Sequence, residues 1–208
     1  VGANRRTEKT GLEQDSQSGS GGFALLAESD VPIHSDLNME EDKLGLGFSD
    51  EEMRALKATA FYPFRVLPGD DVSCLNLYRP GTPRVLGVPD DIIQRGGFQF
   101  QQILRKTDRP WTLLNENLGP DMVPAFGDFN SVMWILQKSM GDDVEIRTEN
   151  GEVVKLRLVG LFSTSIFQGE LLISEANFLA HFPGRSGYGF HLINTPSDTA
   201  PQVSGLLE

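Results

Sequence analysis

Residues 128–182 read DFNSVMWILQKSMGDDVEIRTENGEVVKLRLVGLFSTSIFQGELLISEANFLAHF, and this stretch decides the fold. Asp128 is a predicted N-cap, and the helix that follows should extend to Met140, because apolar residues recur at helical spacing until Gly141 stops the run. The apolar positions are Phe129, Val132, Met133, Leu136 and Met140. The stretch therefore opens with a helix that has one apolar face.

A hairpin, a strand and a second helix follow. Two alternating runs, residues 143–148 and 152–162, are joined through Asn150-Gly151. Asn-Gly readily takes the positive φ angles of a tight two-residue turn, so the pattern predicts a β-hairpin. Residues 171–173 form a short apolar strand, and Ser174 is the predicted N-cap of a helix. This order of elements indicates an α+β fold.

The rest of the chain adds short elements around this stretch. Ser49 and Glu52 form a capping box, which predicts a helix that cannot continue past Pro63. A further helical turn is predicted at residues 89–95, and another helix from Thr199 onwards. Strands are predicted at residues 23–27, 64–67, 72–77, 83–88, 111–114 and 188–193.

Composition favours a globular protein that does not bind nucleic acid. The chain has 208 residues, of which 39% are hydrophobic, and it contains 13 Phe. Its net charge of −11 would repel nucleic-acid phosphates and anionic membrane surfaces. No run approaches the about 18 apolar residues that cross a bilayer, and no signal peptide opens the chain. The sequence as written therefore predicts no membrane span.

Two segments differ from the rest in composition. Residues 1–22 are polar and end in Ser-Gly-Ser-Gly-Gly, which predicts a flexible tether. From Glu28 to Glu52 nine acidic residues stand against Lys43 alone. We interpret this acidic segment as a solvated loop and helix face, and binding of a cation or a basic partner is the alternative.

Residues that commonly carry catalysis or bind metals are few and scattered. His34, His181 and His191 are far apart and show no ligand spacing. Cys74 lies alone in an apolar run, where a buried, inert thiol is the usual outcome. Ser165 belongs to no Gly-x-Ser-x-Gly motif, and no Walker loop or dinucleotide fingerprint occurs. The sequence therefore predicts no enzyme, no metal site and no cofactor site.

Two short motifs are rejected. Gly45-Leu46-Gly47-Phe48 spells a tetrapeptide of peptide-binding PDZ loops, but it precedes a capped helix and lacks a PDZ-like strand order around it. Asp36-x-Asn38-x-Glu40 resembles the start of a calcium-binding EF-hand loop. Glu41 stands where that loop requires Gly, and Gly47 where it requires Glu.

Five other segments are informative because of their order. They are VPAFGD at 123–128, WIL at 134–136, GDDVEI at 141–146, LRLVGL at 156–161 and SIFQGELLI at 165–173. Together they resemble the extracytoplasmic domain of FtsX-like, MacB-related ABC transporter permeases. Residues 23–30 and RVLGVP at 84–89 also fit, so the resemblance covers residues 23–208.

The resemblance implies a MacB-like periplasmic core domain with two lobes. Residues 23–80 and 171–208 would form a Porter-like βαβ lobe, and residues 81–170 an inserted α+β lobe. The domain would lie on the extracytoplasmic side of a bacterial membrane, tethered by flanking transmembrane helices outside this sequence. Implied partners are an ABC ATPase, a second permease, and an extracytoplasmic protein or exported substrate. ATP would bind a separate nucleotide-binding domain and leave this domain without a cofactor.

The function implied is to couple ATP-driven movement of membrane helices to export or to a partner outside the membrane. An extracytoplasmic binding module for a cation or basic peptide, outside any transporter, is the alternative, and a hydrolase is a third class. A partner contact or a contact between the lobes is predicted for residues 163–170, which place apolar side chains between two strands. The residues singled out are Ile166, Phe167, Gln168 and Glu170.

Overall fold

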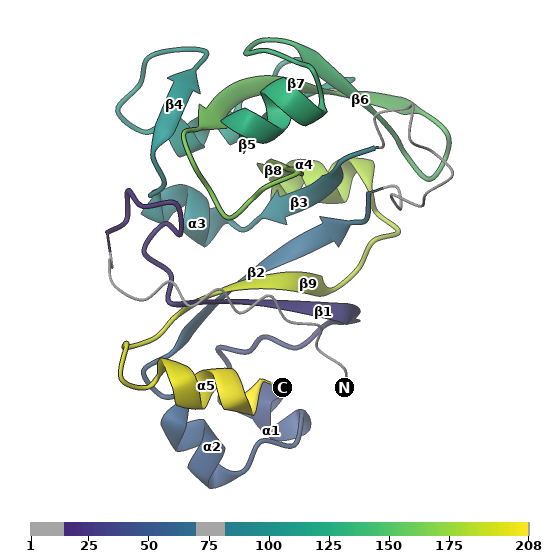
Figure 1. Cartoon of the computed structure of the whole chain (residues 1–208). Coiled ribbons are helices and arrows are strands. Elements are labelled where there is room, and N and C mark those ends of the chain that lie inside the picture. Colours follow the sequence, from purple (N-terminus) through teal and green to yellow (C-terminus); the bar gives the residue numbers. More distant parts are fainter. Residues whose placement is uncertain (1–14, 70–81, 208) are drawn as a thin grey trace.

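The structure, a computed structural model, describes residues 15–69 and 82–207 (Figure 1). Nine strands within these ranges form one mixed sheet in the order β1-β9-β2-β3-β8-β5-β7-β4, with β6 paired to β7. The strands are β1 (Leu25–Ile33), β2 (Ala60–Leu67), β3 (Arg84–Val88), β4 (Phe100–Ile103), β5 (Met122–Asp128), β6 (Asp143–Arg147), β7 (Val153–Phe162), β8 (Glu170–Ser174) and β9 (Tyr188–Asn194).

Short helices accompany the sheet, so the predicted α+β class is confirmed. They are α1 (Glu40–Gly45), α2 (Asp50–Ala55), α3 (Asp90–Arg95), α4 (Glu175–His181) and α5 (Ala200–Leu206), with a 3-10 turn at Pro110–Asn115 and a π turn at Ser131–Ile135. Figure 1 shows α1, α2 and α5 gathered at one end of the molecule, beyond β1. None of the helices in the described ranges is long and apolar enough to cross a membrane.

The sheet mixes both pairing directions. β9 pairs antiparallel with β1 on one side and with β2 on the other. β3 pairs parallel with β8, and β5 pairs parallel with β7. The opposite edge of β7 is shared by β6 and β4, both antiparallel. The last strand of the chain therefore lies between the first two.

Three clusters of buried side chains form the core. The first cluster is rich in aromatic rings, including Phe98, Phe126 and Phe162. The second lies on the other side of the sheet under α4 and includes Phe178 and Phe182. β3 shows this division, because its Leu86 and Val88 belong to the first cluster and its Val85 to the second. The third, smaller cluster joins residues of β1, β2, β9 and α5 with Leu37 and with Leu56, the C-cap of α2.

Several locally signalled elements are confirmed. The Ser49 Oγ accepts a hydrogen bond from the Glu52 N–H, and the Glu52 carboxylate accepts one from the Ser49 N–H at 2.7 Å, which completes the capping box of α2. The Ser174 Oγ caps α4 by accepting from the Asn177 N–H. β6 and β7 form the predicted hairpin. The predicted two-residue turn is wrong, because the Thr148 N–H donates to the Glu152 carbonyl oxygen across a loop of residues 149–151, in which only Gly151 takes a positive φ, at +83°.

The helix predicted from Asp128 to Met140 is correct at its start and wrong at its end. Asp128 ends β5, and its Oδ1 accepts from the N–H groups of Asn130 and Ser131, as an N-cap does. Residues 129–135 are helical, with Ser131–Ile135 wound as a π turn. Gln137 then takes a φ of +53°, which is left-handed and ends the helical run before Met140. Four of the predicted apolar positions belong to the second cluster or pack against it, namely Phe129, Val132, Leu136 and Met140.

The strand predicted at residues 111–114 is wrong, because these residues lie in the 3-10 turn Pro110–Asn115. Pro110 presets the first residue of a 3-10 turn, and the Trp111 ring turns into the core, where its Nε1–H donates to the Gly97 carbonyl oxygen at 2.7 Å. Two elements, β4 and α1, were not predicted from the sequence. Pro63, which was expected only to limit the preceding helix, lies within β2 and pairs with His191 of β9. The strand predicted at residues 72–77, with Cys74, lies outside the described residues.

Residues 15–22 of the predicted tether are packed against the core. The Ser16 carbonyl oxygen accepts from the Phe98 N–H, and the Gly21 carbonyl oxygen accepts from Arg95 at 2.9 Å. Gly21 has a φ of +62°, and a Cβ there would lie 2.4 Å from the Phe98 ring. The glycines therefore permit a close approach to an aromatic side chain, which composition alone does not reveal.

Candidate functional site

The connection, residues 163–169, joins the end of β7 to the start of β8. It contains three of the four predicted contact residues, and the fourth, Glu170, is the first residue of β8. Segments far apart in the sequence hold it in place. The bonds run from the Ser163 N–H to the Gln99 carbonyl oxygen, from the Ser165 N–H to Asp128, from the Ile166 N–H to the Gly19 carbonyl oxygen, and from the Gly169 N–H to the Ser131 Oγ. The connection is therefore a junction of the fold.

Asp128 provides its central anchor. The carboxylate is 2% exposed, and its Oδ1 accepts from the N–H groups of Asn130 and Ser131 at 3.1 and 3.2 Å. Its Oδ2 accepts from the N–H of Ser165 at 3.1 Å. One buried carboxylate thus holds both the π turn and the connection, because charged acceptors form strong hydrogen bonds in a buried setting.

The Ser165 hydroxyl has a structural role. It is buried and donates to Asp128 at 3.4 Å, while its oxygen accepts from the Phe167 N–H at 3.3 Å. A serine nucleophile needs an exposed oxygen and a base that takes its proton. These contacts instead fix the backbone so that the next aromatic side chain enters the core.

Phe167 lies fully inside the first cluster. Its ring centroid is 6.0 Å from Phe64 and 5.9 Å from Phe190, which belong to the predicted Porter-like range. It is also 5.1 Å from Phe98 and 6.0 Å from Phe162, which belong to the predicted inserted range. Phe167 therefore packs between the two ranges. The division into two lobes stays a prediction.

The other predicted contact residues differ in exposure. Ile166 is half-buried against the first cluster, Gln168 is exposed, and Glu170 is 8% exposed at the start of β8. A contact with a partner outside the domain stays a prediction. Along this part of the chain, Gln168 presents its side chain to solvent and Phe167 does not.

Glu170 belongs to a cluster of two carboxylates and one guanidinium. The parallel register of β3 and β8 places Arg84 opposite Glu170. The Arg84 Nη1 donates to Glu170 Oε1 at 2.9 Å and to Glu28 Oε1 of β1 at 2.8 Å. The second oxygen of Glu170 is buried and has no hydrogen-bond partner among the described residues.

The protonation state of this cluster changes near neutral pH. The pKa of Glu170 is raised to about 7, mainly by burial and also by the neighbouring Glu28 carboxylate, while Arg84 lowers this pKa and so opposes both effects. A proton on the unpartnered oxygen would remove the excess negative charge. The sequence carries a weak signal of this cluster, since Arg84 and Glu170 each stand directly before an apolar run that becomes a strand.

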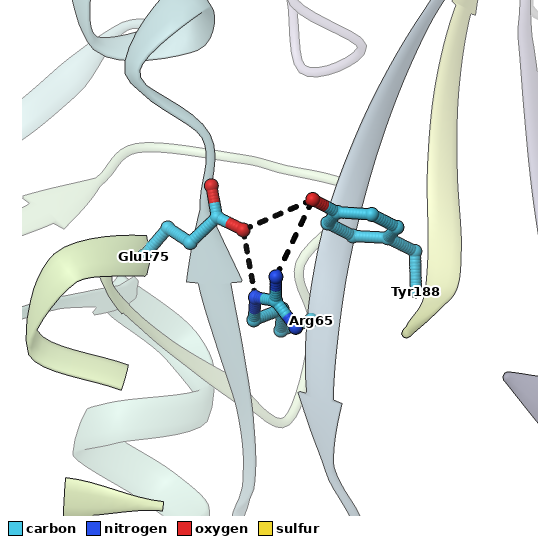
Figure 2. Close-up of polar contacts among 3 residues, drawn as sticks. All are labelled: Arg65, Glu175 and Tyr188. Carbon is cyan, nitrogen blue, oxygen red and sulfur yellow. Dashed lines mark hydrogen bonds and ion pairs between the residues drawn. The ribbon is translucent and has the colours of Figure 1, made fainter. Parts of the chain in front are cut away.

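A second arginine cluster lies on the α4 side of the sheet (Figure 2). Figure 2 shows Arg65 of β2, Glu175 of α4 and Tyr188 of β9 pointing toward one another. The Arg65 Nε donates to Glu175 at 2.7 Å, the Tyr188 hydroxyl donates to the same oxygen at 3.3 Å, and the guanidinium lies 4.7 Å from the Tyr188 ring centroid. Burial and Glu175 raise the pKa of Tyr188. The cluster ties α4 to two strands.

The histidines do not come together with other metal ligands. His34 is exposed, His181 is half-buried, and His191 is 3% exposed in β9. Burial lowers the pKa of His191 to about 4, so its ring is neutral at pH 7. Within residues 15–69 and 82–207, no group of three or more His, Cys, Asp or Glu side chains is placed to hold a metal ion.

The backbone of the Gly45-Leu46-Gly47-Phe48 motif is engaged in local hydrogen bonds. The Leu46 N–H donates to the Asp42 carbonyl oxygen, the Gly47 N–H to that of Leu44, and the Phe48 N–H to that of Lys43. A PDZ loop uses such amides to bind a peptide carboxylate. Here they close the end of α1, which agrees with the rejection of this motif.

A polar groove of about 550 Å³ was not predicted from the sequence. It lies between residues 115–123 and α4, and Asn115, Asn117, Asn177 and His181 contribute polar side chains to its lining. The Asn177 Nδ2 donates to the Leu114 carbonyl oxygen at 3.2 Å and so fixes α4 against the 3-10 turn. The amide of Asn177 therefore connects two of the segments that line the groove.

No family profile and no curated protein sequence matches the chain. Several solved structures are similar to it, and two of them are described here. The crystal structure of the periplasmic region of MacB from Actinobacillus actinomycetemcomitans is 14% identical with a TM-score of 0.44, over 86% of this chain and 74% of that one. The extracellular domain of the noncanonic ABC-type transporter YknZ from Gram-positive bacteria is 12% identical with a TM-score of 0.37, over 79% of this chain and 83% of that one.

Proposed function

We propose that this chain is an extracytoplasmic domain of an ABC transporter permease, which passes ATP-driven movement of membrane helices to export or to a partner outside the membrane. One observation carries the proposal: segments that resemble such permeases in sequence become neighbours in the sheet. Residues 123–128 lie in β5, 141–146 lead into β6, 156–161 lie in β7, and 165–173 lead into β8. These strands are adjacent in the order β8-β5-β7-β6.

The arrangement of the first and last described elements supports the same proposal. Leu25 of β1 and Val203 of α5 belong to one buried cluster, so the first strand and the last helix within the described residues pack together. Movement of the flanking membrane helices would reach the sheet through this cluster and pass to its far strands, because close-packed interiors transmit strain.

Cysteine labelling of the parent protein tests its location. In a Cys74→Ser background, cysteines replace the exposed residues Glu51 and Asn150, and a membrane-impermeant maleimide is added to cells with an intact inner membrane. We expect both positions to be labelled and the protein to sediment with membranes. A cysteine at the buried Ile173 is the matched control and should remain unlabelled. Labelling only after lysis of the inner membrane would overturn the proposal.

Spin labels at Glu51 and Asn150 test the coupling separately. In a permease–ATPase complex reconstituted in lipid, the distance between equivalent labels on two permeases should change when ATP is added. An unchanged distance at both positions would overturn the coupling and leave the location standing.

Membrane fractionation addresses the alternative, a binding module outside any transporter, because that alternative predicts a parent protein without membrane-spanning segments.

A further inference from the structure

The cluster of Glu28, Arg84 and Glu170 joins strands that are not all neighbours in the sheet. Arg84 and Glu170 lie opposite each other in the adjacent strands β3 and β8, whereas Glu28 belongs to β1 at the edge of the sheet. Two strands, β9 and β2, separate β1 from β3. The Arg84 guanidinium reaches across them over the Phe190 ring of β9, with 5.7 Å to the ring centroid. Its bond to Glu28 at 2.8 Å therefore ties the edge strand directly to β3.

Glu28 stands where the pairing of β1 becomes irregular. Residues 25–28 pair with β9 in continuous register, and the register shifts between Glu28 and Ile33. The second half of β1 is also more exposed than the first, and Val31 is 68% exposed. The bond to Arg84 therefore holds the last regularly paired residue before the irregular part of this strand.

Arg84 is shared by two carboxylates. A single nitrogen, Nη1, donates to Glu28 Oε1 at 2.8 Å and to Glu170 Oε1 at 2.9 Å. When both carboxylates are ionised, one negative charge remains uncompensated, and the two carboxylates repel each other. The Glu28 side chain is 37% exposed and that of Glu170 is 10% exposed. Glu28 is therefore the carboxylate that can turn to water at low cost.

Three strands beside Glu170 bring charged groups near it. They are β3 with Arg84, β1 with Glu28, and β5 on the other side of β8 with Asp128 at its end. The Asp128 carboxylate already accepts from three backbone N–H groups. Glu170 Oε2 is buried without a hydrogen-bond partner among the described residues, so a proton on this oxygen removes the uncompensated charge.

We propose that protonation of Glu170 decides how firmly β1 is held to the sheet. While Glu170 carries its proton, Arg84 forms a one-to-one ion pair with Glu28, and β1 is tied to β3. When Glu170 releases the proton to water, its buried carboxylate keeps Arg84, Glu28 turns to solvent, and β1 is released. Because the pKa of Glu170 is about 7, this change occurs near neutral pH. The inference does not depend on the proposed transporter function.

Amide hydrogen exchange of β1 tests the proposal. The protein is labelled at pH 5.5 and at pH 8.5, and each measured rate is divided by the intrinsic rate of an unstructured peptide at the same pH, so that the ratio reports structural opening. We expect the corrected rates of residues 25–28 to rise between pH 5.5 and 8.5. The rise should exceed that of residues 155–160 in β7 by about three- to tenfold, as expected for loss of a partly buried ion pair.

Three variants assign the effect to the cluster. Glu170→Gln resembles the protonated side chain, so β1 should exchange slowly at both pH values. Glu28→Gln removes the partner of Arg84 on β1, so β1 should exchange rapidly at both. Glu145→Gln is the matched control, because it removes an exposed carboxylate from β6, which pairs with β7 far from β1 in the sheet. This control should keep the pH dependence of the parent.

Three outcomes would overturn the proposal. They are equal corrected rates for β1 at both pH values in the parent, a parent-like pH dependence in Glu170→Gln, and slow exchange of β1 at both pH values in Glu28→Gln. Circular dichroism at each pH verifies that the variants are folded. Since Glu28 is partly exposed, its variant and the parent decide the question even where Glu170→Gln loses its fold.

Discussion

The connection and the α1–α2 end differ in how they are held. The connection receives hydrogen bonds from residues as distant in sequence as Gly19, Gln99 and Asp128, and its Phe167 lies within an aromatic cluster. The α1–α2 end is held by the Ser49–Glu52 capping box, by two hydrogen bonds between Asn38 and Phe61 of β2, and by a small apolar cluster. A change in the first region should therefore affect the whole domain, whereas exposed residues of the second should tolerate substitution.

The largest expected effect is at Phe167. Phe167→Ala removes a ring from the first cluster and leaves a cavity, so the free energy of unfolding should fall by about 3–5 kcal/mol. Urea unfolding followed by tryptophan fluorescence measures this change. Ile166→Ala is the matched control on the same connection, and it should cost less because Ile166 is only half-buried. Equal losses would show that the connection is not a junction of the core.

The next effect concerns pH and compares two buried groups in different strands. The pKa of Glu170 is raised from 4.5 to about 7, so its stabilising contribution is fully present below pH 4.5 and is lost as pH rises to about 7. The pKa of His191 is lowered from 6.5 to about 4, so its contribution is present above pH 6.5 and is lost as pH falls to about 4. Between pH 4.5 and 6.5 the two slopes oppose each other.

Urea unfolding across that pH range should reveal the two slopes one at a time. In Glu170→Gln, stability should rise from pH 4.5 to 6.5, and in His191→Gln it should fall over the same interval, each by on the order of 3 kcal/mol. The parent protein should change much less. Parallel profiles for the parent and the Glu170→Gln variant would contradict the raised pKa of Glu170.

A smaller effect is expected in the partly exposed cluster around Arg65. Tyr188→Phe removes the hydroxyl that contacts Arg65 and Glu175, and it should cost about 0.5–1.5 kcal/mol of unfolding free energy. Absorbance titration of the parent and the variant should also show that the lost tyrosine ionises above pH 10. A normal pKa for that tyrosine would contradict the effect of burial and Glu175.

The smallest effect is expected at Leu44 and Leu46, two exposed leucines at the end of α1. Leu44→Ser and Leu46→Ser should each change the free energy of unfolding by less than about 0.5 kcal/mol, because exposed positions without structural contacts tolerate substitution. Thermal unfolding measures this. A large loss would mean that these leucines support the fold, and the two regions would then differ less than their contacts indicate.

Elements with local signals could be predicted from the sequence. The capping box of α2, the Ser174 cap of α4 and the β6–β7 hairpin each depend on residues close together in the chain, and all three are confirmed. The helix after Asp128 begins as predicted but ends at residue 135, because Gln137 takes a left-handed φ. The apolar period continues to Met140 and does not report this early end.

The polar clusters of the candidate site could not be derived in the same way. Arg84 meets Glu28 and Glu170 because β1, β3 and β8 share one sheet, and the strand order that does this is not encoded in any one segment. Phe167 was predicted as a contact residue from its place between two strands, but its burial depends on Phe64, Phe98 and Phe190 from distant strands. Long-range pairing, not composition, decides both features.

The position of β9 between β1 and β2 has a consequence for biosynthesis. About 120 residues separate Leu67, the end of β2, from Tyr188, the start of β9. At roughly 5–20 residues per second, the ribosome needs on the order of 6–24 s to deliver the strand that joins the first two. During that interval apolar residues such as Phe61 and Phe64 have no β9 beside them, so the nascent chain is a natural client for a holding chaperone.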